Sequence, residues 1–110
     1  MKDDKFYLIH IIDSITNIET YVKPGEFEFF NSKLIQDAVI RNLEIIGEAT
    51  KKVSNELKQK EYDLPWIEMA GLRDVLIHDY FGVDLDIVWN VVKKELPKIH
   101  MLIKKILEEI

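Results

Sequence analysis

Apolar residues recur every three or four positions along two long stretches of the 110-residue chain. In residues 3–22 the repeating positions are Leu8, Ile11, Ile15, Ile18 and Val22, and in residues 33–58 they are Val39, Leu43, Ile46, Thr50, Val53 and Leu57. This spacing places the side chains on one face of an α-helix, and no segment shows the two-residue alternation of a strand. The pattern therefore predicts an all-α fold whose helices pack through these faces.

Turn-forming residues set the limits of the first two helices. Lys-Pro-Gly at 23–25 ends the first one, where proline and glycine favour a turn. Residues 26–32 are an aromatic connector with room for one turn of helix, and Asn31 or Ser32 is placed to cap the next helix. Gly47 lies in the middle of the 33–58 helix, where glycine costs about 1 kcal/mol relative to alanine. That cost suggests close approach of another backbone or of a ligand.

The second half of the chain predicts two or three more helices. A polar loop, residues 58–66, places Pro65 in the first turn of a third helix, which should stop near Gly82. A fourth helix starts near Asp84 or Asp86, and Pro97 kinks it or restarts it as a final helix to Ile110. Residues 1–110 are thus predicted to form one domain, an up-and-down bundle of four or five helices.

The composition of the chain limits the kinds of covalent, metal and nucleic-acid sites that it can contain. It contains no cysteine, so disulfides and thiolate zinc sites are excluded. The first apolar run is interrupted by His10 and Asp13, which makes it a poor signal peptide and no membrane span, and a cytoplasmic protein is expected. The net charge of -5 lacks the basic footprint of a general nucleic-acid binder. Contact with RNA would need a local basic patch or a cleft shared between subunits, and no binding to DNA is expected.

The stretch GLRDVLIHDYFGVD, residues 71–84, concentrates reactive side chains in the third helix. On a helix Arg73 and His78 are about 140° apart, and the long arginine can still reach the cleft that His78 faces. Asp74 lies one turn before His78, where its carboxylate would orient the imidazole. The alternative interpretation is structural, with Asp74 and His78 as an ordinary surface pair and Tyr80 as a packed aromatic.

An arginine and a histidine suit cleavage of RNA by its own 2′-hydroxyl. The histidine can transfer a proton near neutral pH, and the arginine can hold the phosphate and stabilise charge that develops on it. One histidine cannot easily act as both base and acid, so a homodimer that brings two motifs together is expected. No metal-ligand cluster is visible, and no metal or other cofactor is predicted.

Other candidates are weaker. Arg41, Glu44 and Glu48 share one helix face and could line the cleft beside Gly47, or they form a solvated face with intrahelical ion pairs. His10 and His100 are isolated and receive no role. Trp66 and Trp89 are interpreted as core or interface anchors, although Trp66 opens the motif helix and could also stack on a base.

Residues 65–84, PWIEMAGLRDVLIHDYFGVD, strongly resemble the HEPN domain and, within it, the HepT-like toxins of HEPN–MNT toxin–antitoxin modules. The family signature is an arginine, four residues, a histidine, one residue and a tyrosine, which Arg73, His78 and Tyr80 fill without a gap. Residues 38–54 and 83–99 resemble the segments before and after that motif. The resemblance covers most of the chain.

The resemblance implies an all-α homodimer with two motifs facing a shared cleft that cleaves RNA without a metal. It also implies a cognate MNT-type nucleotidyltransferase antitoxin, which uses ATP to AMPylate the motif tyrosine, here Tyr80. Arg73, His78 and Asp74 are then the catalytic residues. A second hypothesis remains: a non-catalytic helical module that binds a nucleotidyltransferase or presents a nucleotide to it.

Overall fold

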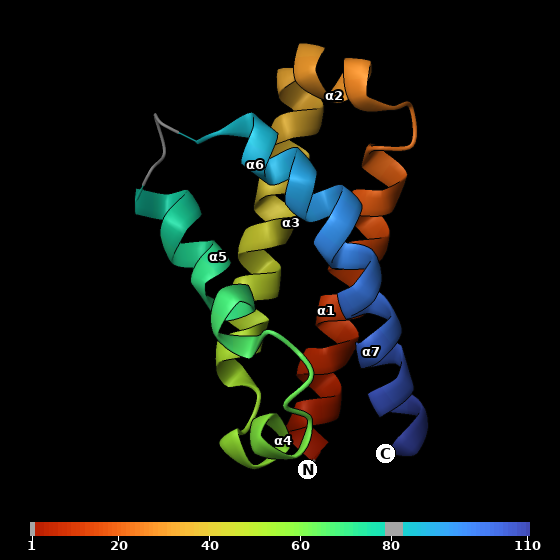
Figure 1. Cartoon of the computed structure of the whole chain (residues 1–110), viewed down its shortest axis with the longest axis vertical. Helices are drawn as coiled ribbons and strands as arrows, with labels where there is room; N and C mark the ends of the chain where they lie inside the picture. The colour runs from red at the N-terminus through yellow and green to blue at the C-terminus, as the bar shows by residue number, and fades with distance from the viewer. Residues whose placement is uncertain (1, 79–82) are drawn as a thin grey trace.

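The computed structural model describes the backbone of residues 2–78 and 83–110 and the side chains of residues 3–72 and 83–110. Four long helical stretches run alternately up and down, and no strand occurs in the described ranges (Figure 1). They are α1 (Lys2–Tyr21), α3 (Lys33–Lys52), α5 (Trp66–His78), and α6 (Leu85–Asn90) continued through a π-helical turn (Val91–Glu95) into α7 (Leu96–Glu109). The predicted all-α up-and-down bundle is confirmed.

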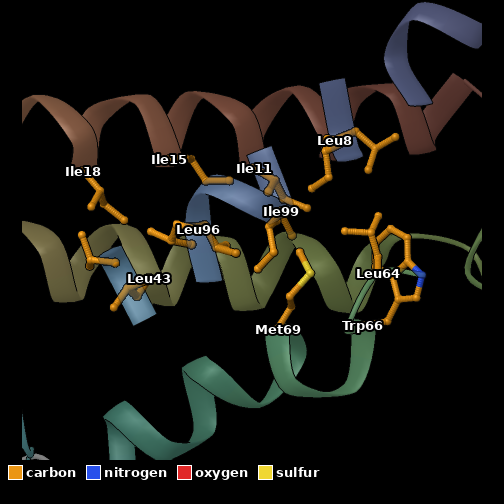
Figure 2. Packing of buried hydrophobic residues seen from close by; sticks show 14 of the residues in the cluster. Leu8, Ile11, Ile15, Ile18, Leu43, Leu64, Trp66, Met69, Leu96 and Ile99 are labelled. Carbon is orange, nitrogen blue, oxygen red and sulfur yellow. The ribbon is translucent and has the colours of Figure 1, made fainter. Parts of the chain in front are cut away.

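The apolar stripes of the sequence form the core between these helices. The α1 residues Leu8, Ile11, Ile15 and Ile18 point toward Leu43 on α3, Leu96 and Ile99 on α7, and Met69 on α5 (Figure 2). All four α1 side chains are 0% exposed. Burial on this scale stabilises the fold by roughly 1.5–3 kcal/mol for each large side chain.

Two short helices join the long ones at opposite ends of the bundle. Helix α2 (Glu26–Asn31) follows Gly25, whose φ of 116° lies in a region that favours glycine. Of the two predicted caps for the next helix, Ser32 is the one used, since its hydroxyl accepts a hydrogen bond from the backbone N–H of Ile35.

The predicted continuous helix over 33–58 is wrong, because the chain breaks between α3 and α4 (Asn55–Lys60). At the break, Ser54 uses its hydroxyl to accept from the N–H of Leu57 and so caps α4. The backbone N–H and the hydroxyl of Ser54 both donate to the buried carboxylate of Asp4, at 2.8 and 2.7 Å. Asp4, which is 50 positions away in the sequence, therefore fixes the chain at the point where α3 ends. The apolar spacing continues through the break, and Val53 and Leu57 are both buried.

Pro97 has the predicted effect on the last helix. The turn before it is π-helical, and the N–H of Leu96 donates to the carbonyl of Val91, five residues back. This wider turn precedes the residue that has no N–H to donate. Val88, Val92 and Leu96, spaced four apart along this stretch, are all buried.

Candidate functional site

The helix that carries Arg73 and His78 is fixed at its first turn. Trp66 is 7% exposed, and its indole N–H donates to the carbonyl of Glu61 at 2.8 Å. Met69 is buried, and its backbone N–H donates to the carbonyl of Pro65, so proline stands just before the helix rather than inside it. Trp66 and Met69 reach the core beside α1 and α3 (Figure 2). Trp66 is therefore a core anchor, and its burial leaves no face for stacking on a base.

The backbone of α5 continues through Arg73, Asp74 and His78. His78 follows Arg73 by five positions, which on a helix is about 7.5 Å along the axis and about 140° around it. Asp74 and His78 are one turn apart on a common face of this helix. The side chains of these three residues, Tyr80, and the predicted helix end at Gly82 lie outside the described residues.

The chain is anchored again directly after the motif. The Asp84 carboxylate caps α6 by accepting from the N–H groups of Asp86 and Ile87, at 2.9 and 3.3 Å, and of the two predicted helix starts, Asp84 and Asp86, the first is therefore the one used. Trp89 then packs against Phe29, with ring centroids 5.1 Å apart, and Lys93 lies 5.5 Å from the centre of the indole. Trp89 is thus an anchor between α6 and α2. The motif is bounded by two segments that the core fixes.

Arg41, Glu44 and Glu48 lie along the outer side of α3, where they line a groove of about 490 Å³. Nη1 of Arg41 and Oε2 of Glu44 are 3.5 Å apart, so at least part of this face is an intrahelical ion pair. Lys52 continues the same side of the helix. Gly47 is buried on α3, and α3 packs along both α1 and α5.

The opposite wall of the groove comes from α1 and was not predicted. It consists of Phe6, Tyr7 and His10. The ring of Phe6 makes edge-to-face contacts with Tyr7 and His10, with centroid distances of 5.1 and 4.5 Å. A signal was present in the sequence, since Phe6 and His10 are four residues apart and lie off the buried stripe of α1.

Two further observations concern metal ligands and membrane spans. Among the residues whose side chains are described, no three or more histidine, aspartate or glutamate side chains gather as metal ligands would. No helix in the described ranges is sufficiently long and apolar to cross a membrane.

Several proteins are similar to this chain in sequence. One relative is a chain from Methanocaldococcus jannaschii whose name combines a gamma-glutamylcyclotransferase with an RNase assignment. It is 54% identical over 110 residues, and the match covers 99% of this chain and 50% of that protein. The present chain therefore spans half the length of this relative. "Probable ribonuclease HepT" of Thermococcus cleftensis is 46% identical over 99 residues, which covers 89% of this chain and 90% of that one.

A third relative, from Caldanaerobacter subterraneus, also carries an RNase assignment in its name. It is 41% identical over 110 residues, and the match covers 98% of that protein. No solved structure resembles the chain closely enough to count as a match. The family described as "Ribonuclease HepT-like" matches residues 11–106, which include both anchored segments and the whole motif. The chain belongs to the HepT-like family.

Proposed function

We propose that this protein is a metal-independent endoribonuclease, the toxin of a toxin–antitoxin module, with Arg73 and His78 as its catalytic residues. The observation that carries the proposal is the motif, whose Arg73 and His78 lie on one helix that the buried Trp66 and Met69 fix at its first turn. A fixed helix supports catalysis because reacting groups must be held in place to within fractions of an ångström. Membership in the HepT-like family and the RNase assignments of relatives support the same reaction.

The proposed reaction is an attack by the 2′-hydroxyl of RNA on the adjacent phosphorus. One His78 takes the proton of the 2′-hydroxyl as the oxygen–phosphorus bond forms. The bond from phosphorus to the 5′-oxygen breaks, and that oxygen leaves with a proton. The products are a 2′,3′-cyclic phosphate and a 5′-hydroxyl. Arg73 binds the phosphate and stabilises the charge that develops on its oxygens, while Asp74 orients His78.

The second proton donor would come from another copy of the chain. Each chain supplies one motif histidine, and the reaction uses a base and an acid on opposite sides of the phosphorus. A homodimer with the two α5 helices facing one cleft would supply both. It would also concentrate two arginines at the phosphate, which helps an acidic chain with a net charge of -5 to bind RNA.

Regulation is proposed to act on Tyr80 through an MNT-type nucleotidyltransferase antitoxin. That partner would transfer AMP from ATP to the tyrosine oxygen and release pyrophosphate. Tyr80 follows His78 by two residues in the sequence, so the added phosphate, ribose and purine would occupy the RNA cleft. The new phosphate would also compete for Arg73.

A second candidate function is a non-catalytic helical module that binds a nucleotidyltransferase. The acidic net charge favours it, because a general RNA-binding surface is normally basic. This module would bind the partner but would leave RNA intact.

Cleavage of RNA by the purified chain decides between these two functions. His78→Ala and Arg73→Ala should each lower the cleavage rate by about 10²–10⁴-fold while helical content, measured by circular dichroism, stays unchanged. Activity should persist in EDTA, and the products should carry a 2′,3′-cyclic phosphate. Full activity in His78→Ala would remove the histidine from the mechanism, and an inactive unmodified chain would favour the binding module.

Co-expression with an MNT-type nucleotidyltransferase tests the regulation. The peptide that contains Tyr80 should gain the mass of an adenylyl group in the mass spectrum, and the modified protein should lose RNase activity. Tyr80→Phe should keep the fold and most of the cleavage, yet escape silencing. If Tyr80→Phe is silenced as well as the unsubstituted chain, the partner acts by sequestration instead.

A further inference from the structure

The groove between α1 and α3 contains a combination of side chains that neither the core nor the motif explains. Phe6 is 55% exposed although it is a large aromatic residue, and it lies across from the charged side of α3. The groove volume of about 490 Å³ is in the range of small-ligand sites. Its lining includes an aromatic ring and cations, the groups that stack on unpaired bases and hold their phosphates, and carboxylates, which can accept a hydrogen bond from a base amino group.

We propose that this groove binds a nucleobase of the RNA substrate, with Phe6 as the stacking platform; this inference rests on the proposed ribonuclease function. Edge-to-face contacts with Tyr7 and His10 hold the Phe6 ring from the side. A ring held in this way loses little further freedom when a base stacks on it. Over half of its surface stays exposed for that contact.

The α3 wall supplies the polar contacts. The Arg41 side chain is 71% exposed, and its ion pair with Glu44 keeps the guanidinium on the groove side of α3. Arg41 and Lys52 can neutralise the phosphates that flank the base. The Glu44 carboxylate can accept a hydrogen bond from the exocyclic amino group of a base, a group that cytosine has and uracil lacks. The groove should therefore prefer cytosine to uracil.

The position of the groove fits a strand that also reaches the motif. Helix α3 packs against α1, which forms one wall of the groove, and against α5, which carries Arg73 and His78 (Figure 1). One helix diameter, about 10–12 Å, separates the two flanks of α3. Phe6 lies in the first turns of α1, at the end of the bundle that carries α4, whereas the carboxyl end of α5 points toward the other end (Figure 1). A strand must therefore cross α3 and also run along the bundle, so the groove would hold a base several nucleotides from the scissile phosphate, outside the catalytic cleft itself.

The charges make a second copy of the chain a poorer occupant. Arg41, Glu44, Glu48 and Lys52 all line the groove, whereas the centre of a protein–protein interface is depleted of charged side chains. Phe6 is the only lining residue among the exposed large apolar side chains of the described residues. Single-stranded RNA accepts this mixture, because its own surface alternates apolar bases with charged phosphates.

The test measures RNA binding by the full chain with His78→Ala, so that the RNA stays intact. Fluorescence anisotropy with a labelled oligocytidylate should give a Kd that Phe6→Ala weakens by about 5- to 150-fold, the range for losing one stacked base. Phe6→Trp should retain binding. Phe27→Ala is the matched control, because Phe27 is 74% exposed on α2 and does not line the groove. Oligouridylate should bind more weakly than oligocytidylate, and Glu44→Gln should reduce that difference.

The outcomes separate this inference from the proposed function. If the unsubstituted chain cleaves RNA and Phe6→Ala leaves both Kd and cleavage unchanged, the groove assignment is overturned and the ribonuclease function stands. If Phe6→Ala leaves the Kd unchanged but shifts the sedimentation coefficient toward a smaller species, the groove holds a second copy and the inference is equally overturned. If the unsubstituted chain cleaves no RNA, the proposed ribonuclease function is overturned, and the groove inference that rests on it is overturned as well.

Discussion

Helices α1 and α5 are both apolar in sequence, but they use that character differently. Along α1, the stripe from Leu8 to Ile18 is 0% exposed at each of its four large positions. In residues 66–72 of α5, Trp66 and Met69 are buried and Leu72 packs partly against the core, but Ile67 is 85% exposed. Packing therefore determines the sequence of α1 over most of its length. In residues 66–72 of α5, packing determines the sequence at only some positions, since Ile67 is an apolar residue that the core does not require.

The largest stability difference between the two helices should come from truncating one isoleucine in each. Ile15→Ala should lower the free energy of unfolding by about 2–5 kcal/mol, because it leaves a cavity among side chains of three helices. Ile67→Ala removes an exposed side chain and should change it by less than about 0.5 kcal/mol. Urea unfolding followed by circular dichroism gives both values. Equal losses would show that another surface, such as a second copy of the chain, covers Ile67.

The next effect concerns how α1 controls the end of α3. Asp4→Ala should cost about 1–3 kcal/mol, because it leaves the N–H and hydroxyl of Ser54 without their carboxylate partner. Asp3→Ala is the control: Asp3 is exposed in the same first turn and should cost only about 0.3–1 kcal/mol through the helix dipole. Chemical denaturation of the pair measures the difference. Similar costs would mean that Asp4 acts only as a first-turn acid.

The smallest expected effect is a gain in stability. A methyl group added at Gly71 would meet no described atom within 4 Å, so Gly71→Ala should stabilise α5 by about 0.5–1 kcal/mol. Thermal unfolding measures that gain. A stabilised variant with impaired RNA cleavage would place RNA or a second chain against the helix backbone two residues before Arg73. Destabilisation would show that the space around Gly71 is already filled.

The helices could be predicted from the sequence because the apolar spacing directly reflects which side chains are buried. Caps such as Ser32 and Asp84 were also predictable, since each acts on the backbone two or three residues away. The break at Ser54 could not be predicted, because the carboxylate that fixes it belongs to Asp4 and the apolar spacing runs on through the break.

The candidate site also has one part that could be predicted from the sequence and one part that could not. The motif residue types, and the positions of Arg73, Asp74 and His78 on one helix, could be predicted from local sequence alone. The α1 wall of the groove could not, because the contact of Phe6 and His10 with the Arg41 side of α3 depends on how two helices pack. The roles of Arg73, Asp74, His78 and Tyr80 stay predictions that the experiments above address.

The up-and-down order of the helices also determines where something can be joined to this domain. Both chain ends lie at the end of the bundle that carries α4, while α5 points its carboxyl end toward the other end, where α6 begins (Figure 1). A fusion partner, purification tag or surface linker attached to either terminus would therefore stand away from the motif. The same geometry suits circular permutation, in which a short linker joins the old ends and new ends open elsewhere.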